Sequence, residues 1–203
     1  MKIKLQEVSK KFGTQQILKN ISKEFLSGKK YAITGANGSG KSTLLRILSG
    51  MLTPNTGNVI YTEKDLEILP EDFFRHISYC APYLDLPEEL TLSELLFFHE
   101  SLKPFHEITK EEITILLEIP ADKEIRNLSS GMKQRVKFAL AFFTQSKVLL
   151  LDEPTANFDD KWKAWYRTLL EKDTQNRITI ICSNEKEEYD FVAEVFPIPT
   201  EFL

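Results

Sequence analysis

A chain of 203 residues is long enough for one well-buried α/β domain or for two small lobes that share a core. The hydrophobic content of 42% and the charged content of 28% are ordinary for a globular protein, and the net charge of −4 disfavours nucleic acid as the main partner. No apolar run is long enough to span a bilayer, and the first residues lack the apolar core of a signal peptide, so we expect a cytoplasmic chain. Cys80 and Cys182 have no metal-ligand spacing and are expected to be core thiols.

Strand patterns dominate the first part of the chain. Alternating apolar residues predict strands over residues 2–8 and 29–34, and the second of these leads into a helix over 41–50. The turn "TPNTG" precedes "NVIYT", residues 58–62, which we interpret as an edge strand. Residues 77–81, "ISYCA", predict a further short strand.

Helical signals then replace the strands. Thr91 with Glu94, and Thr109 with Glu112, each fit a capping box that opens an amphipathic helix, and a third helix begins near Ser129.

Strands return at "KVLLLD" and "RITIIC", separated by a helix around residues 161–172. This order predicts one α/β domain over residues 1–203. Its parallel-sheet core would comprise about 1–84 and 146–203, and a helical subdomain would be inserted at about 85–145.

A phosphate-binding loop follows the strand over residues 29–34. The segment "GANGSGKS" satisfies G-x-x-x-x-G-K-[ST] between a predicted strand and a predicted helix, which makes an incidental glycine-rich turn the weaker alternative. Glycines let successive backbone N–H groups point at phosphate oxygens, and the helix adds its positive N-terminal end. We expect Lys41 to reach the β- and γ-phosphates and Ser42 to ligate Mg²⁺. The expected nucleotide-binding residues of this segment are Gly35, Ala36, Asn37, Gly38, Ser39, Gly40, Lys41, Ser42 and Thr43.

Two carboxylates follow the most apolar strand of the sequence. Val148–Leu151 predict a strand buried on both faces, and Asp152 and Glu153 come directly after it, where ligands bind in open α/β sheets. We expect Asp152 to serve the magnesium ion and Glu153 to polarise the attacking water. The alternative, two carboxylates that cap a helix, accounts for one of them at most.

The segment between these two elements identifies a family. Residues 128–135, "LSSGMKQR", resemble the L-S-G-G-Q signature of ABC ATPases, with Ser130 for the first Gly and Met132 for the Gln. Taken in order with the phosphate-binding loop and "LLLDEP", the resemblance covers nearly the whole chain, although "SSG" alone could be an ordinary helix cap.

The resemblance implies a P-loop NTPase fold with a mostly parallel sheet core, N-terminal antiparallel β strands and an inserted helical subdomain. It implies ATP and Mg²⁺ as ligands and a head-to-tail homodimer, or paired cassette. Each signature segment would then contact the ATP that the other subunit holds, which assigns Ser129, Gly131 and, in the D-loop "TANFD", Asp159 to the nucleotide site.

The same resemblance implies a stacking residue and a membrane partner. Phe12 occupies the position of the aromatic residue that stacks on adenine, although a buried strand-end aromatic is the alternative. The helical subdomain of such proteins docks against separate transmembrane permease subunits, which would hold the chain at the cytoplasmic face of the membrane.

The sequence lacks two residues of the family pattern. No Gln occurs between residues 17 and 133, so Pro82 or Tyr83 takes the place of the Q-loop Gln, and Asn184 stands where the switch His is expected. Proline offers no side-chain ligand, and Asn keeps a hydrogen-bond donor but cannot be charged. Because the loss of one preorganised donor typically costs about 10²- to 10³-fold in rate, we expect slow ATP hydrolysis, with Glu153, Lys41 and Asn184 as the catalytic residues.

The sequence is compatible with three functions. The leading hypothesis is the ATP-hydrolysing subunit of an ABC transporter. The alternatives are a soluble ABC ATPase without transport, in translation or repair, and a module that dimerises on ATP but barely hydrolyses it. A kinase or GTPase would leave "LSSGM" and "DEPTANFD" unexplained.

Overall fold

The computed structural model describes residues 1–198, so residues 199–203 of the predicted core lie outside the described residues. The elements in chain order are β1 (Lys2–Phe12), β2 (Gln15–Leu26), β3 (Lys30–Thr34), α1 (Lys41–Leu48), β4 (Thr56–Glu63), β5 (Leu66–Ile68), the 3₁₀ helix η1 (Pro70–Arg75), β6 (Ile77–Cys80), α2 (Leu92–Leu102), α3 (Lys110–Leu117), η2 (Ile125–Asn127), α4 (Ser130–Phe143), β7 (Val148–Asp152), α5 (Asp160–Glu171), β8 (Ile178–Cys182), η3 (Lys186–Glu188) and β9 (Glu194–Pro197).

The chain forms two compact units. Unit 1 contains Met1–Tyr79, Ser146–Glu153 and the residues from Thr174 on; unit 2 contains Cys80–Gln145 and Pro154–Asp173. Sequence analysis assigned residues 154–173 to the core, whereas the structure groups them with the helices. The reason is packing, since the ring of Phe138 on α4 lies 5.4 Å from that of Trp165 and 5.2 Å from that of Tyr166, both on α5.

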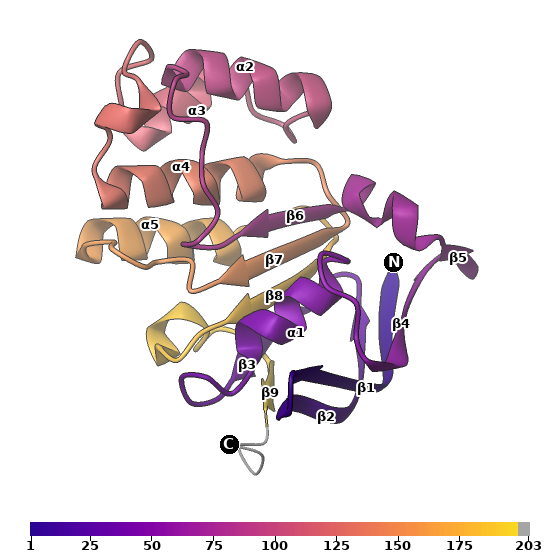
Figure 1. Ribbon diagram of the computed structural model, residues 1–203. Helices are drawn as coiled ribbons and strands as arrows, with labels where there is room; N and C mark the ends of the chain where they lie inside the picture. Colours follow the sequence, from indigo (N-terminus) through magenta and orange to yellow (C-terminus); the bar gives the residue numbers. More distant parts are fainter. Residues whose placement is uncertain (199–203) are drawn as a thin grey trace. The chain divides into compact units, whose positions relative to one another are not determined.

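One sheet of unit 1 is antiparallel, with the strand order β2-β1-β4-β5 (Figure 1). The expectation that residues 58–62 form an edge strand is wrong, because β4 pairs with β1 on one side and with β5 on the other. Strand β2, which sequence analysis did not predict, is the edge of this sheet next to β1.

The apolar pattern of β2 explains why it was not predicted. Its buried residues are Leu18, Ile21 and Phe25, a spacing of three and four that is typical of a helix. Asn20 has a positive φ of 49°, and the register with β1 shifts where Val8 pairs with Ile21 and Lys10 with Leu18. An extra residue in one strand changes which side chains face the core. Because of this bulge, the buried residues of the strand have the spacing that a helix would have.

The second sheet of unit 1 has the strand order β6-β7-β8-β3-β9, and β7, β8, β3 and β9 run parallel to one another. All five residues of β7 and of β8 are buried, as expected for strands covered on both faces. Strand β9 was not predicted, because it has only four residues and ends on Pro197, a residue that a strand tolerates at an edge.

The helices of unit 2 begin where the sequence predicts. Thr91 and Thr109 form complete capping boxes with Glu94 and Glu112, and these open α2 and α3. In each box the threonine side chain accepts from the backbone N–H three residues on, while the glutamate accepts from the N–H of the threonine, so two otherwise unpaired donors are satisfied.

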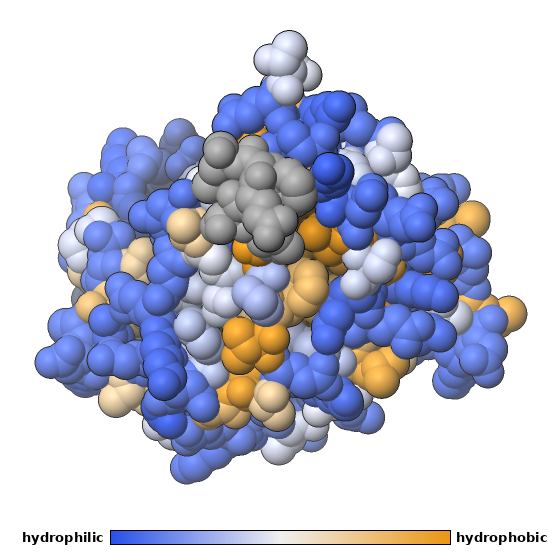
Figure 2. Space-filling model, turned by 90° about the horizontal axis from the view of Figure 1, so that it is seen from below, coloured by the Kyte–Doolittle hydropathy of each residue, from blue (hydrophilic) through white to orange (hydrophobic). Residues whose placement is uncertain are grey.

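The surface of the described residues is mixed. The face in Figure 2 is mainly hydrophilic, with groups of hydrophobic residues between hydrophilic ones, which is normal for a folded chain. Among residues 1–198, no helix combines the length and the apolar character needed to cross a membrane.

Tyr61 on β4 provides a test of the packing in unit 1. It is fully buried, burial raises the pKa of its hydroxyl well above the usual value, and that hydroxyl donates to the carbonyl of Leu48 at the end of α1. Tyr61→Phe leaves a buried carbonyl without its donor, so we expect the free energy of unfolding in urea to fall by about 1–3 kcal/mol. Tyr83→Phe, at a position that is 50% exposed, is the control; equal effects of the two variants would contradict this assignment.

Candidate functional site

The loop between β3 and α1 is shaped by buried neighbours and by its own lysine. Strand β3 is buried at Tyr31, Ala32 and Ile33, which fixes the start of the loop. The ammonium of Lys41 donates to the carbonyl of Gly35, at 2.8 Å, and to that of Ala36, at 3.2 Å. This cation is therefore held across the loop, where it can meet phosphate oxygens.

Gly40, the last residue before α1, allows the loop to lie directly against β2. Its φ is 98°, a left-handed conformation that favours glycine. A Cβ at this position would lie 2.8 Å from Cγ2 of Ile17 and 3.0 Å from Cδ2 of Leu18. The close approach brings Ile17 to the phosphate-binding loop and leaves no room for a side chain at residue 40.

The two carboxylates after β7 have different environments. Asp152 is 1% exposed, as the last residue of a strand in which Val148–Leu151 are fully buried. Glu153 is exposed and has a positive φ of 42°, and its backbone N–H donates to the carbonyl of Cys182 at 2.9 Å. The strained turn at Glu153 thus directs its side chain out of the core immediately after a buried carboxylate.

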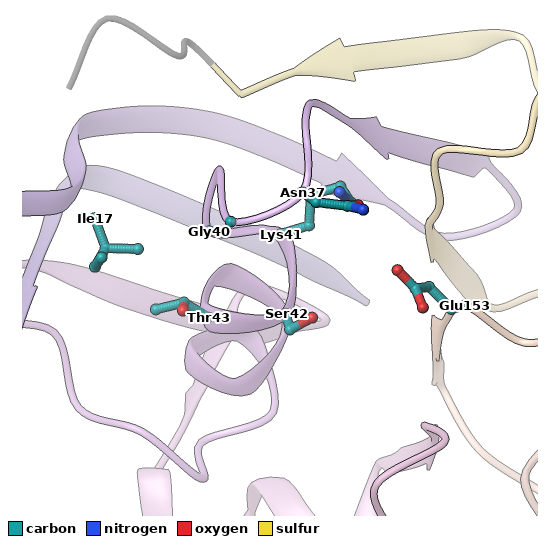
Figure 3. Close-up of a pocket in the computed structure, with 8 residues that line it drawn as sticks. Ile17, Asn37, Gly40, Lys41, Ser42, Thr43 and Glu153 are labelled. Atoms are coloured by element: carbon teal, nitrogen blue, oxygen red, sulfur yellow. The ribbon is translucent and has the colours of Figure 1, made fainter. Parts of the chain in front are cut away.

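A cavity of about 360 Å³ collects most of these residues (Figure 3). In Figure 3, Glu153 lies on one side, Ile17 and Thr43 lie on the other, and Lys41 and Ser42 lie between them. The lining consists of Ile17, Asn37, Gly38, Gly40, Lys41, Ser42, Thr43 and Glu153. The predicted base therefore shares one cavity with the predicted phosphate and magnesium ligands.

Asn184 reaches the same loop. Its side-chain amide donates to the side-chain oxygen of Asn37, which lines the cavity. Both side chains are exposed, so they form a polar pair at the rim of the phosphate-binding loop. Asn184, two residues after the end of β8, therefore contacts the loop directly, although it cannot change charge.

Cys182 lies beneath this site as a neutral thiol. Burial raises the pKa of Cys182 well above its usual range, the negative charges of Asp152 and Glu153 raise it further, and the positive charge of Lys41 lowers it. The thiol contacts the carbonyl of Lys41 at 3.7 Å. Charges of both signs thus act on the Cys182 thiol. Cys182 is fully buried, which is consistent with the expectation of a core thiol.

Some predicted residues do not line the cavity. Phe12 is 50% exposed, with the ammonium of Lys10 5.4 Å from its ring centroid. Gly35, Ala36, Ser39 and Asp152 also lie outside the lining. Ile17 lines it although sequence analysis missed it, since its strand was not predicted.

The remaining predicted residues belong to unit 2, where each has a local structural role. Ser129 caps α4 by accepting from the N–H of Met132 at 3.3 Å, and Asp159 caps α5 by accepting from the N–H of Trp162 at 3.1 Å. A Cβ on Gly131 would lie 2.8 Å from the carbonyl oxygen of Asn157. The signature segment and the D-loop segment are therefore in close contact within unit 2.

The donor groups of the site fit magnesium bound together with a nucleotide. No group of three or more His, Cys, Asp or Glu side chains that could hold a metal ion occurs in the part of the chain that the structure describes. Mg²⁺ prefers hard oxygen ligands and usually keeps waters and substrate phosphates in its shell. The Ser42 hydroxyl at the cavity and the buried Asp152 carboxylate provide such oxygens.

The family model for ABC transporters matches residues 18–156 of the chain. The chain belongs to the ABC transporter family. The ABC ATPase resemblance and the α/β fold predicted from the sequence are thereby confirmed. Curated relatives of this family carry the names of import ATP-binding proteins.

Individual relatives differ in length from this ABC cassette. It is 33% identical to the sulfate/thiosulfate import ATP-binding protein CysA of Thermosynechococcus vestitus, covering 96% of this chain and 60% of that protein. It is 30% identical to the putative hemin import ATP-binding protein HrtA of Staphylococcus haemolyticus, and the match covers 98% of this chain and 97% of that protein. It thus spans about three fifths of the first relative and nearly all of the second.

A solved structure shows the same fold. A dimeric ATP-binding cassette in a post-hydrolysis state, bound to ADP and Pi, superposes with a TM-score of 0.82 at 23% identity, covering 97% of this chain and 94% of that one.

Gly40→Ala tests the contact between the loop and β2. The new methyl group must displace Ile17 and Leu18, so we expect ATP affinity to fall at least about tenfold and the free energy of unfolding to fall by about 1–3 kcal/mol. Equilibrium binding of a fluorescent ATP analogue and urea unfolding measure the two effects.

Gly13→Ala is the matched control, because Gly13 also has a positive φ, of 57°, but a Cβ there meets nothing within 4 Å. Wild-type nucleotide affinity in Gly40→Ala would show that nucleotide binding does not depend on the close contact between the loop and β2.

Proposed function

We propose that the chain binds and hydrolyses ATP as the ATPase subunit of an ABC transporter. The observation that carries this proposal is the position of Glu153, which lines the same cavity as Lys41 and Ser42. A carboxylate base, a phosphate-binding ammonium and a magnesium-ligating hydroxyl are the groups that phosphoryl transfer to water requires.

Each group of the site has a defined task in this proposal. The backbone N–H groups of residues 35–43 and the start of α1 bind the phosphates, and Lys41 neutralises charge on the β- and γ-phosphates. Ser42 and Asp152 hold the magnesium ion that accompanies ATP, and this ion supplies further charge neutralisation. Glu153 orients and polarises the attacking water, while Asn184, joined to Asn37, donates a hydrogen bond toward the γ-phosphate.

Adenine and ribose would contact the apolar side of the site. Ile17 lines the cavity beside Thr43, and Phe12 precedes β2 by a short turn. Stacking on Phe12 needs only a π-face, so we retain this residue as the adenine contact and add Ile17 as a second apolar contact.

Closure as a head-to-tail homodimer would complete the site. Ser129 and Gly131 lie at the start of α4, whose N-terminal end is suited to an anion, and Asp159 lies in the segment that contacts it. In the dimer these residues act on the ATP held by the second subunit, so ATP joins the subunits and hydrolysis releases them.

Unit 2 provides a surface for the transmembrane permease subunits. Phe97, Phe98 and Leu102 lie along α2 and are 65%, 51% and 68% exposed. Apolar side chains exposed at such spacing on one helix favour a protein partner. The chain would then lie at the cytoplasmic face of the membrane through its permease, and the transported substrate is selected by those separate subunits.

Hydrolysis should be slow. At the position of the Q-loop Gln the chain has Pro82, which offers only its backbone carbonyl, and at the switch position Asn184 remains neutral at any pH. These two residues also favour the second candidate function, a module that dimerises on ATP and barely hydrolyses it. Steady-state turnover distinguishes the two functions.

We predict magnesium-dependent turnover below about 1 s⁻¹ for the wild type, compared with ~10 s⁻¹ for ordinary enzymes. Glu153→Gln should lower turnover at least about 100-fold while ATP binding is kept, because the amide preserves the shape of the side chain but cannot act as a base. Phosphate release measures both rates.

Glu67→Gln, at an exposed position on β5, is the control. Hydrolysis by Glu153→Gln at the wild-type rate would refute the assignment of the base, and no turnover in the wild type would favour the dimerisation module.

Asn184→His tests the cause of the slow rate. An imidazole at the end of β8 restores a donor that can carry charge next to the γ-phosphate, so we expect kcat to rise about five- to tenfold. Asn58→His, at an exposed asparagine on β4, should leave kcat unchanged. If Asn184→His lowers kcat instead, the hydrogen bond between Asn184 and Asn37 supports hydrolysis better than a histidine at position 184 does.

A further inference from the structure

Lys137 on α4 holds the segment that replaces the Q-loop. Its ammonium donates to the backbone carbonyl of Pro82 at 2.6 Å. One turn earlier, the side-chain amide of Gln134 contacts Sγ of Cys80 at 3.7 Å, and the side chain of Lys133 donates to Glu88 at 2.5 Å. Three neighbouring side chains of one helix therefore bind residues 80–88, all within unit 2.

The same helix also contacts the segment that follows the predicted base. The Gln134 amide donates to the carbonyl of Pro154 at 3.0 Å, and Gln134 is only 2% exposed. Gly131 meets the carbonyl of Asn157, as described above. Helix α4 thus connects residues 80–88 with residues 154–157.

The contact of Lys137 is the most informative of these, because it holds the backbone at Pro82. A proline has no side chain that can hydrogen-bond, so only its carbonyl is available to fix this segment. Burial lowers the pKa of Lys137, which indicates that the ammonium has lost part of its hydration. A charged hydrogen bond in such surroundings is stronger than one in water.

The start of α4 lies on the same rigid element. Ser129 caps the helix eight residues before Lys137, and an α-helix of that length spans about 12 Å. Because α4 is one continuous helix, a displacement of residues 80–88 that moved Lys137 would move Ser129 and Gly131 with it.

We propose that Lys137 is a positioning residue, which couples the Pro82 segment to the signature end of α4 and so controls how that end meets the nucleotide of the second subunit. This inference rests on the proposed function. It adds a named mechanical link between residues 80–88 and the signature end of α4.

Lys137→Met tests the link, because the variant keeps the apolar stem and removes only the ammonium. We expect kcat for ATP to fall about tenfold, with KM and the binding of a fluorescent ATP analogue unchanged within twofold, because Lys137 does not line the cavity. Lys137→Arg should restore most of the rate.

Lys110→Met is the matched control. Lys110 is also a partly buried lysine of unit 2, but its ammonium pairs with Glu100 on α2, at 2.8 Å. Its kcat should equal that of the wild type, and thermal unfolding of all variants shows whether the fold is retained.

A wild-type kcat in Lys137→Met would overturn the inference. So would parallel losses of kcat and thermal stability that Lys137→Arg does not restore, because these indicate a purely structural role. If the wild type does not hydrolyse ATP, the proposed function fails while the coupling is still measured by ATP-dependent dimerisation in the Glu153→Gln background. There, Lys137→Met should weaken dimerisation about tenfold, and an unchanged dimer affinity would reject the link.

Discussion

The close contact between the phosphate-binding loop and β2 is the constraint on which the nucleotide site depends. Gly40 leaves the space that Ile17 and Leu18 occupy, so the loop lies on the antiparallel sheet while α1 continues from it. The loop therefore joins the two sheets of unit 1. Because Gly40 has no side chain, Ile17 on β2 lines the same cavity as the loop residues Lys41 and Ser42.

The position of the two carboxylates Asp152 and Glu153 depends on the burial of β7. A strand covered on both faces delivers Asp152 as a buried carboxylate, and the left-handed turn that follows exposes Glu153 to the cavity. Two adjacent carboxylates thus acquire different environments without any difference in chemistry. We propose that this difference separates the magnesium ligand from the base, with the neutral Cys182 thiol packed beneath them.

The sequence predicted the elements whose signals are local. The loop between β3 and α1, the buried strand β7 and the capping boxes at Thr91 and Thr109 each depend on a few neighbouring residues, and the structure has all of them. Strand β2 escaped prediction because its bulge at Asn20 gives the buried residues a helical spacing. Ile17 was missed with it, and the grouping of α5 with the helices depends on aromatic contacts that no local pattern reveals.

Unit 2 contains both the signature segment, residues 128–135, and Pro82, one of the two departures from the family pattern. Helix α4 begins at the signature, and its side chains hold the segments around Pro82 and Pro154. The chain therefore keeps the signature helix in contact with both segments even though the usual Gln is absent. We propose that these contacts permit slow hydrolysis despite the missing Gln.

In the proposed mechanism two chains share two ATP molecules, each held by the loop of one chain and contacted by the signature of the other. The most direct measurement is the mass of Glu153→Gln in solution, by light scattering after size exclusion, together with the number of bound ATP molecules. We expect a monomer without nucleotide and a dimer of about 47 kDa, twice the chain mass of 23.4 kDa, with two ATP molecules in the presence of ATP and Mg²⁺. A monomer that holds one ATP at saturating concentration would contradict it.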